Sequence, residues 1–161
     1  MRRGAGLVVG GVLAACSAAS DPAQDQYTLD FPSTASAVAT ETVQVLVFDP
    51  SPTVAKAQLC ATLLQKRKSN QSMGKAVVES TPVSPCDLSR RGSVTVPFGE
   101  HAIVAIARKE NKDYMLGCTF QTVAAGDPPA TVYLTPVSSQ VLTPATKCPA
   151  LSNFCGRNCP P

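Results

Sequence analysis

Seven cysteines in a chain of 161 residues constrain its fold more than any other feature. One of them, Cys16, stands near the start, and the other six are Cys60, Cys86, Cys118, Cys148, Cys155 and Cys159. An even number of cysteines in an exported chain predicts up to three disulfides, and six cysteines allow fifteen complete pairings. A metal site is disfavoured, because the last three cysteines lack zinc-site spacing and His101 is the single histidine. The sequence leaves the pairing open.

The first fifteen residues have the pattern of an export signal. Arg2 and Arg3 make a positive start, and residues 4–15 (GAGLVVGGVLAA) are uncharged and mostly apolar. A helix of twelve residues spans roughly 18 Å, whereas the hydrocarbon core of a bilayer is about 30 Å thick. We therefore interpret residues 1–15 as a removable signal peptide rather than a membrane span.

The end of this run, Leu13-Ala14-Ala15-Cys16, resembles the lipobox of bacterial lipoproteins. The resemblance implies cleavage before Cys16, a thioether-linked diacylglycerol on its sulfur and acylation of the new α-amino group. Two or three acyl chains hold a protein firmly on a membrane. Ser17, where that family's inner-membrane retention signal has Asp, favours the outer membrane and leaves its periplasmic or cell-surface face open. The alternative is an ordinary secretory signal whose cleavage site adjoins a disulfide cysteine.

Charge excludes one class of partner. Of the 14 Lys and Arg residues, Arg2 and Arg3 belong to the leader, which leaves 12 basic against 11 acidic residues. A nearly neutral chain lacks the basic surface that nucleic-acid binding requires, so we expect no nucleic-acid partner. No motif calls for a cofactor.

Periodicity predicts a mainly β domain over residues 42–134, preceded by a flexible tether over residues 16–41 and followed by a Cys/Pro-rich tail over residues 135–161. Tyr27, Leu29 and Phe31 alternate with polar residues and leave an added edge strand open. The predicted elements are strands over 42–49, 93–97, 101–108, 114–123 and 130–134, a short strand over 76–79 and one helix over 53–68. The helix has Val54, Ala57, Ala61 and Leu64 as its apolar stripe, which Cys60 and Leu63 widen toward one side, and it brings Cys60 to a disulfide. Short strands with Gly and Pro between them are typical of an antiparallel, immunoglobulin-like β-sandwich, here with a disulfide-braced tail.

The run from Val94 to Leu134 resembles the closing half of transthyretin-like and carboxypeptidase-regulatory-like sandwich modules. The matching residues are Val96-Pro97-Phe98-Gly99, Ile103 to Ala107, Gly117, and Thr131-Val132-Tyr133-Leu134. The resemblance implies a sandwich fold and brings no catalytic residues with it.

No catalytic set stands out. His101, two residues after a glycine, is expected to be an exposed residue at the start of a strand, and Ser72-x-x-Lys75 lacks its partner motifs. Asp49, Asp113 and Asp127 are expected at turns, where Asp is common.

The sequence contains three basic clusters, at residues 66–68, 90–91 and 108–109. Together they could bind anionic sugars or lipid headgroups, but separate, solvated clusters are the simpler interpretation. The leading hypothesis is a non-enzymatic, membrane-anchored envelope lipoprotein with a structural or protein-interaction role. The alternatives are a surface module that binds glycan or peptide, and a peptidase inhibitor that uses the Cys/Pro-rich tail.

Overall fold

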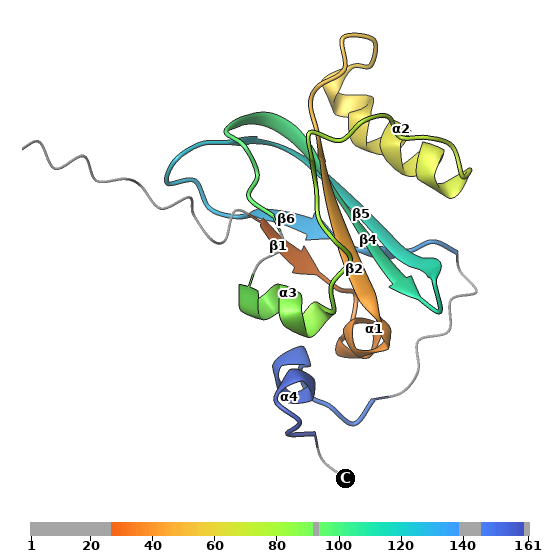
Figure 1. Ribbon diagram of the computed structural model, residues 1–161, viewed down its shortest axis with the longest axis vertical. Coiled ribbons are helices and arrows are strands. Elements are labelled where there is room, and N and C mark those ends of the chain that lie inside the picture. The colour runs from red at the N-terminus through yellow and green to blue at the C-terminus, as the bar shows by residue number, and fades with distance from the viewer. Residues whose placement is uncertain (1–26, 92–93, 139–145, 160–161) are drawn as a thin grey trace, which may run out of the picture.

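The computed structural model in Figure 1 describes residues 27–91, 94–138 and 146–159. The signal peptide, Cys16 and the tether up to residue 26 lie outside the described residues. The elements in chain order are β1 (Tyr27–Asp30), α1 (Thr34–Ala39), β2 (Thr42–Phe48), α2 (Lys56–Lys68), β3 (Val78–Glu79), α3 (Pro85–Arg91), β4 (Gly99–Lys109), β5 (Lys112–Val123), β6 (Ala130–Tyr133), β7 (Thr135–Pro136) and α4 (Leu151–Cys155).

A five-stranded antiparallel sheet in the order β3-β2-β4-β5-β7 forms the centre of the molecule. The runs that build β2, β4 and β5 are rich in β-branched residues and are buried on both faces in their middle parts. β4 and β5 are joined by a two-residue turn at Glu110 and Asn111, whose φ angles of 51° and 59° suit the twist of a hairpin. The mainly β fold and these strands are confirmed.

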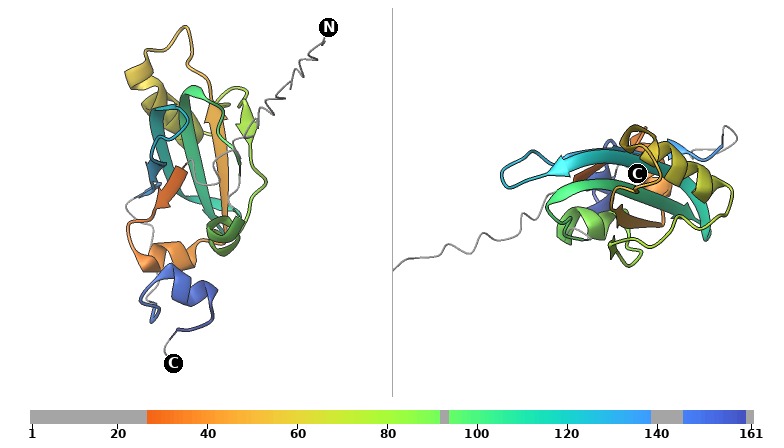
Figure 2. Two further views of the ribbon diagram at one scale, coloured as in Figure 1. Left: turned by 90° about the vertical axis from the view of Figure 1, so that its left-hand side faces the viewer. Right: turned by 90° about the horizontal axis from the view of Figure 1, so that it is seen from above.

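The two faces of the sheet are covered differently, as Figure 2 shows. α2 packs on one face, over a core of Leu46, Phe48, Leu59, Leu63, Ala102, Val104, Ile106 and Leu116. On the other face lies a ribbon of two parallel strands, β1 and β6, over a core that includes Val45, Ile103 and Val132. The last predicted strand, β6, is therefore not part of the antiparallel sheet and pairs with the N-terminal segment instead.

That N-terminal pairing corrects the predicted tether. Residues 27–30 form β1 and residues 34–39 form α1, so the expected tether is not free chain up to residue 41. Two physical causes act here. The alternating Tyr27 and Leu29 pack against the core, and the Ser33 hydroxyl caps α1 by accepting a hydrogen bond from the Ser36 N–H at 3.1 Å.

The expectation of a single helix was wrong, because residues 27–91, 94–138 and 146–159 contain four helical segments. α3 begins with Pro85, whose fixed φ suits a first helical turn, and the Ser84 hydroxyl accepts a hydrogen bond from the Asp87 N–H at 3.1 Å. Residues 94–97 do not form the predicted strand, although Val96 is buried as its alternation indicated.

The predicted apolar face of α2 is confirmed in part, since Leu63 is buried and Val54, Cys60 and Leu64 pack against the core. Leu59 and Leu63 are the buried residues of α2, whereas Ala57 and Ala61 are exposed. The larger side chains bury more apolar area per residue, and they therefore determine how the helix is rotated on the sheet.

Three disulfides brace the domain and its tail, as the even cysteine number predicted. Cys60–Cys118 joins α2 to β5, and Cys86–Cys155 joins α3 to α4. Cys148–Cys159 closes a loop within the tail. The tail is thus ordered by cross-links both within itself and to the domain, and its described part contributes β7 and α4.

Candidate functional site

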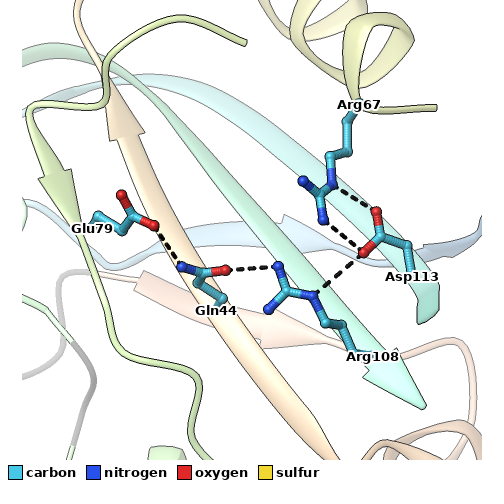
Figure 3. Close-up of polar contacts among 5 residues, drawn as sticks. All are labelled: Gln44, Arg67, Glu79, Arg108 and Asp113. Carbon is cyan, nitrogen blue, oxygen red and sulfur yellow. Dashed lines mark hydrogen bonds and ion pairs between the residues drawn. The ribbon is translucent and has the colours of Figure 1, made fainter. Parts of the chain in front are cut away.

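A row of polar side chains crosses the α2-covered face of the sheet beyond the C-terminal end of the helix (Figure 3). The Gln44 amide nitrogen donates to Glu79 Oε1 at 2.7 Å, and its oxygen accepts from Arg108 Nη2 at 2.8 Å. Arg108 Nε lies 3.5 Å from Asp113 Oδ1. Arg67 then reaches Asp113 from α2 through two hydrogen bonds, from Nε at 2.6 Å and from Nη2 at 2.9 Å.

The Arg67–Asp113 pair is the strongest contact of the row. Two parallel N–H···O bonds fix the guanidinium in one plane, and the two side chains are only 31 % and 22 % exposed. The side-chain hydrogen bonds that Arg67 donates to Asp113 raise the pKa of Arg67; partial burial opposes this effect and the coulombic attraction of Asp113 adds to it. Arg67 is therefore a permanent cation held in a fixed position.

A pocket of about 480 Å³ opens where α2 ends beside the β4–β5 hairpin. Its lining combines three cations, one carboxylate, two amides and two apolar side chains: Arg67, Lys68, Lys112, Asp113, Asn70, Asn111, Leu116 and Val137. Because the carboxylate of Asp113 is engaged by both Arg67 and Arg108, cationic charge exceeds anionic charge at this pocket. Throughout residues 27–91, 94–138 and 146–159, no acidic side chain forms an ion pair with Lys68 or Lys112.

Backbone hydrogen bonds at the C-terminal end of α2 shape the helix side of this pocket. α2 ends in a Schellman motif, in which the Asn70 N–H bonds to the Arg67 carbonyl and the Gln71 N–H bonds to the Lys66 carbonyl. Asn70 has φ 53°, a left-handed conformation that Asn tolerates better than most residues. Basic residues in the last turn also suit the negative end of the helix dipole.

Of the three basic clusters in the sequence, the structure brings parts of two together. Arg67 and Lys68 lie beside the hairpin that carries Arg108 and Lys112. Lys109 instead stands over the Tyr114 ring at 6.0 Å. Arg90 and Arg91 belong to α3, which packs through Leu88 on the core of the opposite face, so this cluster is separate from the pocket.

His101 is buried rather than exposed, contrary to expectation, with 6 % of its surface accessible. β4 begins two residues earlier than predicted, so His101 lies inside the strand. Its Nδ1 stands 3.0 Å from Asp49 Oδ1, and its Nε2 stands 3.3 Å from the Phe98 carbonyl oxygen. Both ring nitrogens lie near protein oxygens, but among the described residues Nδ1 makes no hydrogen bond of good geometry. In the other discounted motif, the Ser72 hydroxyl accepts from the Gly74 N–H in an exposed loop.

Two residues of the row were missed as site residues in the sequence. Asp113 was expected at a turn, but it is the second residue of β5, close to the turn at Glu110 and Asn111. Gln44 carried a usable sign, because it is the only amide in the apolar run of β2, and a buried amide requires partners. Its burial, at 9 % exposure, fits that requirement.

No family model, curated protein or solved structure matches the chain.

Two further findings concern only the described part of the chain. No helix there is long and apolar enough to cross a membrane. No group of three or more His, Cys, Asp or Glu side chains there is arranged to hold a metal ion.

Proposed function

We propose that the protein is a non-enzymatic lipoprotein of the bacterial cell envelope, anchored by lipid on Cys16, whose domain has a structural or protein-interaction role. One observation carries this proposal. The six cysteines from Cys60 to Cys159 form three disulfides with one another, which leaves no cysteine in the chain for Cys16 to pair with. The alternative of a disulfide cysteine beside a cleavage site is thereby weakened, and the lipobox gives Cys16 a different use. Ser17 favours the outer membrane.

The intact mass of protein extracted from native membranes tests this proposal. We expect a chain that begins at Cys16, with an excess mass equal to two or three acyl chains and a glycerol unit. Thiol labelling should find six thiols, and only after reduction. The variant Cys16→Ser is the control, which should lose the lipid mass and keep all three disulfides. An unlipidated native chain with a free thiol would refute the anchor.

We also propose that the sheet and the β1–β6 ribbon form a reduced β-sandwich of the transthyretin-like kind. The support is a shared core, in which Val132 of β6 packs with Val45 and Ile103 of the sheet. Gly117 of β5 approaches the Tyr133 carbonyl so closely that an added Cβ would lie 2.5 Å from its oxygen. A variant with a side chain at Gly117 tests this contact between the layers.

A second candidate function is a surface module that binds glycan or peptide, and the pocket between α2 and the hairpin favours it. A pocket of about 480 Å³ has the size of small-ligand sites, and most of the residues that line it are polar or charged. Of the three basic clusters in the sequence, the one at Arg90 and Arg91 is not part of this pocket, so substitutions that test ligand binding belong elsewhere. The third candidate, a peptidase inhibitor, is tested by deleting residues 143–161, which should abolish inhibition.

A further inference from the structure

We infer that the pocket between α2 and the β4–β5 hairpin binds an anionic saccharide, a sugar that carries a phosphate or carboxylate group. The inference rests on the second candidate function, surface ligand binding, and does not depend on the lipid anchor. It starts from the charge of the lining, where Arg67, Lys68 and Lys112 stand against the single carboxylate of Asp113.

The arrangement of Arg67 provides a fixed anion-binding group. Nε and Nη2 are both used on Asp113, so the outer nitrogen, Nη1, has no hydrogen-bond partner among the residues that the structure describes. Asp113 is held in turn by Arg108, and Arg108 by Gln44 (Figure 3). Because this row fixes the guanidinium before any ligand arrives, binding an anion there costs little side-chain entropy.

The two lysines add charge from opposite walls. Lys68 is in the last turn of α2 and Lys112 is in the first position of β5, and both line the pocket. Neither forms an ion pair with an acidic side chain in the described ranges. An ammonium group is a strong partner for phosphate or carboxylate, since a hydrogen bond to a charged group contributes about 1.5–3 kcal/mol.

The remaining lining favours a sugar over a bare anion. Asn70 and Asn111 each offer an amide that can donate to and accept from hydroxyl groups. Val137, which is partly exposed, supplies an apolar surface for the C–H face of a sugar ring, above the buried Leu116. The volume exceeds what a single phosphate needs and lies within the range of about 300–1,000 Å³ typical of small-molecule sites.

Isothermal titration of the full protein, purified in non-ionic detergent, tests this inference with three probes: glucose 1-phosphate, glucuronic acid and glucose. We expect saturable binding of at least one anionic probe that weakens as salt is added, and much weaker binding of glucose. The phosphate and carboxylate arms show which anion the site prefers. The double variant Lys68→Glu/Lys112→Glu should lower the affinity for the anionic probe by at least about tenfold, because two charge-assisted contacts are replaced by repulsion.

The matched control is Arg90→Glu/Arg91→Glu, which makes the same change in net charge on α3, away from the pocket. It should leave the affinity within about twofold, because α3 packs on the core of the opposite face of the sheet and contributes no residue to the pocket lining. An equal loss in both variants would mean long-range attraction only and would overturn the inference. If Lys68→Glu/Lys112→Glu does not fold, amide spectra of the unmodified protein replace it. Glucose 1-phosphate should then shift residues 67–70 and 111–113.

Two other outcomes separate this inference from the function on which it rests. Binding of glucose as tight as that of glucose 1-phosphate would overturn the anionic ligand and keep a sugar-binding module. Failure of all three probes, with saturable binding of an acidic peptide at the same residues, would overturn the saccharide and keep the second candidate function. No saturable binding of any of these ligands would overturn both.

Discussion

At the scale of single residues, Gly117 shows how closely the two layers approach. An alanine Cβ at this position would lie 2.5 Å from the Tyr133 carbonyl oxygen and 3.0 Å from Val132 Cγ1. The nearest atom belongs to the backbone, so rotating a side chain cannot relieve the clash that a Cβ would make. β5 and β6 are thus packed with no room for a side chain between them at this point.

We expect Gly117→Ala to lower the free energy of unfolding by about 3 kcal/mol, the upper part of the range for overpacked cores, because the layers must separate. Chemical denaturation with the disulfides intact measures the change. Gly126→Ala is the comparison, since its φ of +84° is unfavourable for Ala but no atom lies within 4 Å of the added Cβ. Its loss should be only about 1–2 kcal/mol, the cost of a left-handed conformation. Equal losses would show that the close contact is not rigid.

Asp113 is the residue on which the polar row depends, because two guanidinium groups share its carboxylate. Asp113→Ala should lower the free energy of unfolding by about 2 kcal/mol, the effect of losing a charge-assisted, partly sheltered pair. Asp30→Ala, on an exposed position of β1, should change it by less than about 0.5 kcal/mol. Thermal unfolding of both variants checks the difference, and equal shifts would mean that the row contributes nothing to stability.

Residues of this kind mark the limit of what the sequence could predict. Gln44 could be recognised as unusual because it interrupts an apolar strand, but its partners Glu79 and Arg108 are 35 and 64 residues away. His101 was expected to be exposed because the strand was expected to begin there, whereas β4 begins at Gly99 and encloses His101. Local pattern reveals that a polar group needs a partner, whereas the identity of the partner is decided by strand register.

At the scale of elements, α2 is attached to the sheet by two means, an apolar contact and a disulfide. Leu59 and Leu63 bury their side chains in the core of this face, and Cys60 bonds to Cys118 of β5. Arg67 adds the ion pair to Asp113 at the other end of the helix. The helix is therefore held at its middle and at its C-terminal end, where the pocket lies.

We expect Cys60→Ala/Cys118→Ala to lower the free energy of unfolding by about 4 kcal/mol, given the closure of a loop spanning 58 residues. Amide hydrogen exchange in α2 should become faster than in β4. Cys148→Ala/Cys159→Ala opens a loop of only 11 residues, so its loss should be about 3 kcal/mol and should leave α2 protection unchanged. Faster exchange of α2 in both variants would contradict an independent role for each disulfide.

Elements were predictable where local pattern decided them. The strands at β2, β4 and β5 have clear apolar runs, and the hairpin has turn residues between two of those runs. The sequence does not decide whether residues 27–30 form a strand, nor does it indicate their parallel pairing with β6, because their partner lies about a hundred residues away at 130–133. The apolar face of α2 was predicted in part, because Leu63 and Leu64 pack on the core, whereas Ala57 and Ala61 fit the period but bury too little apolar area to face the core in place of Leu59.

At the scale of the whole molecule, the N-terminal strand and the pocket lie toward opposite ends of the sheet. β1 starts beside Ala130, which follows the end of β5 at Val123 through a short loop, and Val123 is paired with Gly99. The hairpin turn at Glu110 and Asn111 is at the other end of the same two strands (Figure 1). A strand of 11 residues such as β4 is about 36 Å long, so the two ends are well separated.

If Cys16 carries the lipid, eleven residues separate the membrane from Tyr27, a reach of at most about 40 Å. We therefore expect the end with Phe98, which is 66 % exposed, to spend more time near the bilayer than the hairpin. In bicelles with nitroxide-labelled lipid, the amide of Phe98 should broaden more than that of Asn111. Protein with Cys16→Ser should show no such difference. Stronger broadening at Asn111 would place the pocket against the membrane.

The pairing of β1 with β6 also governs the order in which the molecule can be completed. A chain synthesised from its N-terminus contains Tyr27 about a hundred residues before the strand that pairs with it. Until Ala130–Tyr133 has arrived, one face of the sheet stays uncovered and its valines remain in contact with water. The first strand of the chain is therefore among the last to find its partner, and the face that it covers is completed only when residues 130–133 are available.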